Sequence, residues 1–144
     1  MIESDTIKLL RECDAGIKMG VSSIAEVIDH VESDELRSLL ETCKDEHSKL
    51  KSESQQLLSE FHDTGKSPDP MAKSMSWMKT NMKLAMEDSD ATVADLMTDG
   101  CNMGVKSLNR YLNQYEAADE RSKDITKRLI NLEAQLAVDM RSFL

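Results

Sequence analysis

The stretch Met-Gly-Val-Ser-Ser-Ile at residues 19–24 returns 84 residues later as Met-Gly-Val-Lys-Ser-Leu at residues 103–108. Around both copies, mostly apolar side chains recur at spacings of three and four, which is the period of one helix face. In the first copy these positions are Ile7, Leu10, Asp14, Ile17, Val21, Ile24, Ile28 and Val31. In the second copy they are Ala94, Thr98, Cys101, Val105, Leu108, Leu112 and Tyr115. The pattern predicts two long helices that are equivalent halves of one bundle.

The overall composition also favours an all-α fold. The chain has 144 residues, of which 31 % are charged and 3 % aromatic, with only five Gly and two Pro. This mixture suits a helical bundle and is poor for a sheet. From the length we expect one domain covering residues 1–144, which is long enough to bury a core without disulfides.

The charge and the cysteines limit the classes of function. A net charge of −9 argues against a nucleic-acid backbone or an anionic membrane as partner. The first residues lack the basic and apolar segments of a secretory signal, and no apolar run approaches the roughly 18 residues of a membrane span. Cys13, Cys43 and Cys101 are widely spaced on apolar helix faces, so we expect buried free thiols in a cytoplasmic protein.

Short polar segments divide the first half of the chain into two helices. Asp5 or Thr6 is expected to cap the first helix. The polar turn at residues 32–35 is short, so the second helix must return antiparallel to the first. We therefore predict a first hairpin over about residues 5–61.

A crossover and a second hairpin follow. Both prolines lie in the loop at residues 62–70, which opens a crossover over about residues 62–88. The second hairpin is expected over about residues 90–144, with its turn at residues 116–119. The predicted architecture is a four-helix bundle of two antiparallel hairpins, with an extra Met-rich helix in the crossover.

The crossover helix carries a stripe of methionines at spacings of four and three. Its members are Met71, Met75, Met78, Met82 and Met86, with Trp77 beside them. Thioethers are flexible and polarisable, so the stripe is a candidate interaction face for a partner helix or a soft metal. The alternatives are packing on the chain's own bundle and contact with a second copy.

Candidate metal ligands lie in the middle of the predicted bundle. Metal centres of four-helix bundles are built from carboxylate and imidazole side chains on facing helices. Asp14, Glu46, His47 and Glu133 fall within about two turns of one another along the bundle axis. They are therefore candidate ligands for iron or manganese.

Three positions depart from the usual pattern of such a centre. Lys44 stands three residues before His47, and Leu136 stands three residues after Glu133. Thr98 occupies the position of the second copy that corresponds to Asp14. The alternative interpretation is a set of polar residues that are satisfied in the core and set the helix register, or that hold a water molecule.

The chain resembles the ferritin-like superfamily of rubrerythrin- and ferritin-type bundles, and is closest to a bacterial branch filed as a domain of unknown function. The resemblance rests on Asp-Ala-Gly at residues 14–16, the helix from Leu36 to Leu50 and Trp-Met-Lys at residues 77–79. It extends to the segment from Ala91 to Leu96 and to Gly100, so it covers nearly the whole chain.

The resemblance implies a fold and two possible functions. Ferritin-like relatives often oxidise or store iron, or handle peroxide, and the ligands it implies here are Asp14, Glu46, His47 and Glu133. Our leading expectation is a cytoplasmic, non-enzymatic bundle with a degenerate metal centre and no cofactor. It would act through protein contact or self-association, as a homodimer. The alternative is an iron- or manganese-binding protein in oxidative or metal stress.

Overall fold

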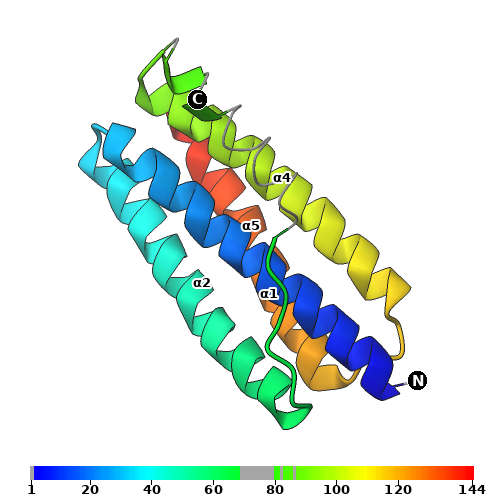
Figure 1. Cartoon of the computed structure of the whole chain (residues 1–144). Coiled ribbons are helices and arrows are strands. Elements are labelled where there is room, and N and C mark those ends of the chain that lie inside the picture. The colour runs from blue at the N-terminus through cyan, green and yellow to red at the C-terminus, as the bar shows by residue number, and fades with distance from the viewer. Residues whose placement is uncertain (1, 69–79, 82, 86) are drawn as a thin grey trace.

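Four long helices make up most of the residues that the structure, a computed structural model, describes: 2–68, 80–81, 83–85 and 87–144 (Figure 1). Their bounds are Ile2–Val27 for α1, Asp34–Glu60 for α2, Asp90–Gln114 for α4 and Glu120–Met140 for α5. Short 3-10 helices extend α1 and α5 at Ile28–His30 and Arg141–Phe143. These ranges contain no strand, so the predicted all-α class is confirmed for them.

Three of the helices begin at a polar side chain that caps them. The hydroxyls of Ser33 and Ser89 and the carboxylate of Asp119 each accept a hydrogen bond from the backbone N–H three residues later. Such a cap satisfies an N–H that has no partner within the first turn of a helix. Helices α2, α4 and α5 therefore start at the polar segments where the sequence predicts them.

The predicted capping of the first helix by Asp5 or Thr6 is wrong. Helix α1 already begins at Ile2, and both side chains bind the turn between α4 and α5 instead. Asp5 Oδ2 accepts a hydrogen bond from Ala117 N at 3.1 Å, and Thr6 Oγ1 accepts one from Asp119 N at 2.8 Å. These contacts join the two hairpins at one end of the bundle.

The opposite end of the bundle has the matching contact. Asp90 accepts hydrogen bonds from Glu32 N at 2.8 Å and from Ser33 N at 3.1 Å, in the turn after α1. Asp90 follows Thr6 by the same 84 residues that separate the repeated hexapeptides. Asp119 corresponds to Ser33, because each caps the second helix of its hairpin. In both hairpins, then, the first helix binds the turn of the other hairpin.

Neighbouring helices in the chain pack antiparallel. Helix α1 lies against α2, and α4 lies against α5 (Figure 1). Figure 1 also shows α4 beginning at the end of the bundle where α2 begins. Helices α2 and α4 therefore run in one direction, and α1 and α5 run in the other. Residues 61–68, which leave α2, run back beside α1.

The buried apolar side chains form two clusters, one toward each end of the bundle. The largest fully buried members are Ile24, Val27, Leu36, Leu40, Val93 and Met140 in one, and Leu10, Ile17, Leu58 and Leu129 in the other. Burial of each such side chain contributes about 1.5–3 kcal/mol to the driving force for folding. The middle of the bundle, between the two clusters, is polar.

The predicted methionine face lies outside the described residues, which do not include Met71, Met75, Met78, Met82 and Met86. Other residues of the same segment are described, at 80–81, 83–85 and 87–88. Thr80 and Leu84 are helical and buried, with 8 % and 6 % of their surface exposed, and Leu84 belongs to the core cluster near the α1–α2 turn. The crossover therefore supplies at least one side chain to the core of the bundle.

Candidate functional site

A polar layer crosses the middle of the bundle, and each long helix contributes one residue to it. Gly20 of α1 faces His47 of α2, and Gly104 of α4 faces Glu133 of α5. His47 and Glu133 occupy the same position counted from the first residue of their helices, so they are matching residues of the two hairpins. They meet with His47 Nε2 3.8 Å from Glu133 Oε1.

The two glycines make room for these side chains. A Cβ atom at Gly20 would lie 2.8 Å from His47 Nε2, and a Cβ at Gly104 would lie 2.3 Å from Glu133 Oε2. Both separations are shorter than a van der Waals contact. The repeated Met-Gly-Val sequence thus has a structural reason, because in each hairpin its glycine admits the polar residue of the second helix.

His47 is held through its other ring nitrogen. Its Nδ1 donates a hydrogen bond to Cys43 O at 2.8 Å, and Cys43 Sγ lies 3.5 Å from the same nitrogen. A carbonyl oxygen only accepts, so Nδ1 carries a proton and Nε2 is left to face Glu133. Among the described residues, His47 Nε2 and Glu133 Oε2 are buried atoms without a hydrogen-bond partner.

The surroundings of His47 favour its charged form. Burial alone lowers the pKa of an imidazole, because it disfavours the imidazolium. The neighbouring Cys43 and Glu133 outweigh burial and raise the pKa of His47 to about 10. Only 2 % of His47 and 8 % of Glu133 is exposed. At neutral pH the layer therefore holds His47 as a buried imidazolium that faces Glu133 of the other hairpin.

This pair should make stability depend on pH. In the unfolded chain a histidine has a pKa of about 6.5, so above that pH only the folded state keeps the proton on His47. The stabilisation that comes from the proton on His47 is complete below about pH 6.5. It is lost as the pH rises through the pKa of His47 in the folded state. We expect urea unfolding to show an advantage of wild type over His47→Gln that shrinks from about pH 6 to about pH 10. An advantage that stays constant over this range would contradict the assignment.

The three cysteines are free and buried, as the sequence predicts. Burial raises the pKa of the Cys13 and Cys101 thiols to about 12. Cys13 Sγ lies 3.0 Å from Thr126 Oγ1, in the interior of the bundle. Cys13 and Cys101 therefore remain neutral thiols at physiological pH.

Asp14 is not part of the polar layer, so the structure does not bring this predicted metal ligand together with His47 and Glu133. Its Oδ2 is 2.7 Å from Lys18 Nζ and accepts from Lys66 N at 3.0 Å, while Oδ1 accepts from Gln55 Nε2 at 2.7 Å. A Cβ at Gly65, whose φ is +92°, would lie 2.3 Å from Asp14 Oδ2. The carboxylate is fully buried and ties the start of the crossover to α1 and α2.

Glu46 also lies away from the polar layer. Its side chain is 46 % exposed and pairs with Lys49 at 3.0 Å. Adjacent helix positions point about 100° apart, so Glu46 turns outward when His47 turns inward. Of the four predicted ligands, the structure brings together only His47 and Glu133. Across the described ranges, no group of three or more His, Cys, Asp or Glu side chains is arranged to hold a metal ion.

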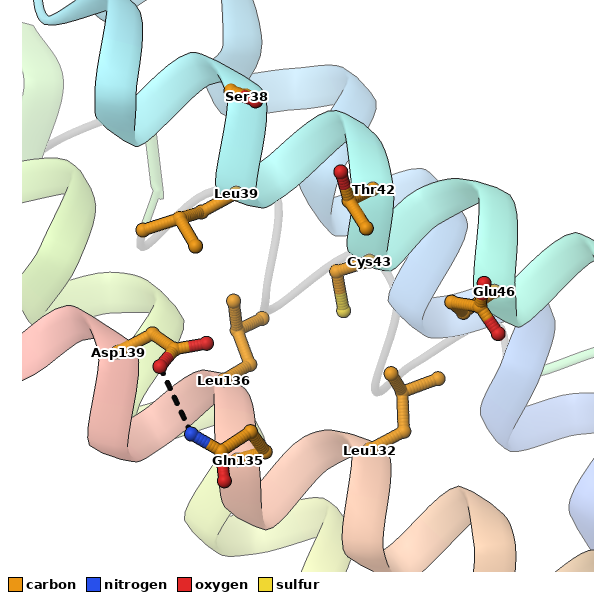
Figure 2. Close-up of a pocket in the computed structure, with 9 residues that line it drawn as sticks. All are labelled: Ser38, Leu39, Thr42, Cys43, Glu46, Leu132, Gln135, Leu136 and Asp139. Atoms are coloured by element: carbon orange, nitrogen blue, oxygen red, sulfur yellow. Dashed lines mark hydrogen bonds between the residues drawn. The ribbon is translucent and has the colours of Figure 1, made fainter.

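A groove of about 220 Å³ opens on the surface between α2 and α5 (Figure 2). Figure 2 shows Glu46 and Asp139 at opposite ends of it, and the Cys43 sulfur pointing into the space between the two helices. The apolar part of the remaining lining comes from Leu39, Leu132 and Leu136, and Ser38, Thr42 and Gln135 supply the polar part. The groove and the polar layer thus share Cys43, which lines the groove and contacts His47.

Sequence reasoning missed the glycines and Cys43 as parts of this site. A signal for the glycines was present, because the repeat places Gly20 and Gly104 at equivalent positions. The spacing of Cys43 and His47 by four residues also puts both on one helix face. The sequence contains no pattern that predicts the groove, because the groove depends on how far apart α2 and α5 pack.

Comparisons of this chain with protein-family models, with curated proteins and with solved structures found no match. In the described ranges, no helix has both the length and the apolar character needed to cross a membrane.

Proposed function

We propose that this protein is a non-enzymatic, ferritin-like bundle that binds a protein partner in the groove between α2 and α5. The observation that carries the proposal is a groove that exposes three leucines between two carboxylates, one at each end. Small-molecule pockets usually enclose about 300–1,000 Å³. A groove of about 220 Å³ suits one or two side chains of a partner better than a whole substrate.

The lining of the groove defines the chemistry of the partner. Leu39, Leu132 and Leu136 offer apolar surface, which fits an aliphatic side chain. Glu46 and Asp139 favour lysine or arginine on either side of it, and the net charge of −9 adds a long-range attraction for a basic chain. The partner we propose is an amphipathic helix whose leucines are flanked by basic residues.

The ferritin-like part of the proposal rests on topology. One long crossover joins the two hairpins, and α2 and α4 run in the same direction (Figure 1). Ferritin-like bundles also have a single long crossover. The free cysteines suit a cytoplasmic location, because a reducing compartment keeps thiols unpaired. Iron or manganese binding ranks second, since only His47 and Glu133 of its predicted ligands lie together.

Charge reversal at the groove tests the proposal. We expect a Leu- and Lys-containing amphipathic peptide to bind the wild type, and Glu46→Lys with Asp139→Lys to weaken binding about tenfold or more. The matched control is Glu3→Lys with Glu116→Lys, which changes the net charge equally at exposed positions outside the groove. Titration calorimetry at low ionic strength gives the affinities.

Two outcomes would contradict the proposal. Equal weakening in both double variants would mean that the peptide responds only to net charge. Concentration-dependent dimerisation that Glu46→Lys with Asp139→Lys abolishes, without peptide binding, would assign the groove to a second copy of the chain. Sedimentation of the same samples distinguishes that case.

A further inference from the structure

The thiol of Cys43 has a setting that neither of the other two cysteines shares. It lines the open groove between α2 and α5, and its sulfur points into the space between these helices (Figure 2). On its inner side, Cys43 Sγ lies 3.5 Å from His47 Nδ1. A small reagent that enters the groove therefore meets a sulfur with an imidazole behind it.

The other side of the imidazole faces an acid. His47 Nε2 faces Glu133 Oε1 at 3.8 Å, and neither His47 Nε2 nor Glu133 Oε2 has another partner among the described residues. A thiol, an imidazole and a carboxylate in this order form the arrangement that activates a sulfur nucleophile. A cationic imidazolium stabilises a neighbouring thiolate, which is the reactive form of cysteine.

Cys13 and Cys101 provide the contrast within the same chain. Neither lines the groove, and burial raises the pKa of both thiols to about 12. Cys13 has a hydroxyl beside it in place of an imidazole, that of Thr126 at 3.0 Å. Of the three cysteines, only Cys43 therefore combines a place in the groove with an imidazole beside its sulfur.

We propose that Cys43 is a thiol–disulfide exchange site for small disulfides with cationic halves. The Cys43 thiolate attacks one sulfur of the disulfide, the bond between the two reagent sulfurs breaks, and a new bond forms to Cys43 Sγ. The released half leaves as a thiolate and takes up a proton equivalent to the one that Cys43 gave up. The net change turns one thiol and one disulfide into a mixed disulfide and one new thiol, so no other oxidant is needed.

The groove sets the preference for size and charge. Its volume of about 220 Å³ and the 4 % exposure of Cys43 admit only a small half. Glu46 and Asp139 at its ends favour an ammonium group over a carboxylate. This inference does not depend on a peptide partner, so it stands or fails separately from the proposed function.

The test compares cystamine with dithiodiglycolate, a disulfide of similar size and opposite charge, on the folded full-length protein. Intact mass and peptide mapping should show one adduct, on Cys43, formed about tenfold or more faster with cystamine. Cys43→Ser should abolish the adduct. His47→Gln should slow it about tenfold or more while circular dichroism shows the helices retained.

A second variant and a second measurement keep the test decisive. If His47→Gln does not fold, Glu133→Gln takes its place with the same expectation of slower exchange. Glu46→Gln with Asp139→Asn should make the rates of adduct formation with cystamine and dithiodiglycolate similar. The adduct should still form on Cys43. Adducts spread over all three cysteines, labelling no faster than the measured rate of global unfolding, or an unchanged rate in the folded His47 or Glu133 variant would each overturn the proposal.

Discussion

Replacing Asp14 with leucine is expected to lower the free energy of unfolding by about 3 kcal/mol, near the low end for breaking a buried ion pair. The side chain is fully buried, and its two oxygens take three contacts, from Lys18, Gln55 and Lys66. Leucine accepts no hydrogen bond, so it leaves these donors without their partner. We expect a loss near the low end of this range because the Lys18 side chain is 28 % exposed and can turn toward water.

Urea unfolding followed by circular dichroism measures this loss. The matched control is Asp45→Leu, at an exposed position of α2, which should change stability by no more than about 0.5 kcal/mol. Hydrogen exchange at the Lys66 amide gives a local readout, because that N–H is donated to Asp14. A leucine variant as stable as the wild type, with the Lys66 amide still protected, would show that Asp14 does not anchor the crossover.

Alanine at Gly20 is expected to destabilise the protein by up to about 2 kcal/mol, although alanine is the better helix former. The added Cβ would lie 2.8 Å from His47 Nε2 and 2.9 Å from His47 Cδ2, so a buried ring must move. Overpacking of this kind costs about 1–3 kcal/mol, and the gain in helix propensity over glycine offsets about 1 kcal/mol of it. Gly104→Ala should act in the same direction through Glu133.

The chain offers its own control for this substitution. Gly100 lies in α4 and a Cβ there would meet nothing within 4 Å, so Gly100→Ala should stabilise the protein by up to about 1 kcal/mol. Combining Gly20→Ala with His47→Ala should cost less than the sum of the single changes, because the truncated ring leaves room for the methyl group. If Gly20→Ala proves as stabilising as Gly100→Ala, the close approach of His47 to α1 is not present in solution.

Much of the fold could be predicted because its signals are local. A cap needs only one side chain and the N–H groups of the next turn, so Ser33, Ser89 and Asp119 can be read directly. The spacing of apolar residues by three and four needs only the geometry of one helix. The repeat also predicted that both hairpins are built alike. In agreement with this, Thr6 and Asp90 each accept a hydrogen bond from the turn of the other hairpin.

The candidate site was less predictable, because its parts come together across helices. Spacing along the axis placed Asp14, Glu46, His47 and Glu133 at similar heights, but height does not say which way a side chain points. Glu46 turns outward beside His47. Asp14 accepts a hydrogen bond from the backbone N–H of Lys66, 52 residues away in the chain. Neither outcome follows from residues close in sequence.

By itself, the sequence determined the helices, their order and the equivalence of the two hairpins, since caps, turns and periodicity act over a few residues. Tertiary structure alone decided which polar groups meet. The rotation and stagger of α2 against α5 bring His47 within 3.8 Å of Glu133, and leave a groove beside Cys43. Such distances depend on how whole helices pack, and changes of an ångström or two in that packing separate a contact from none.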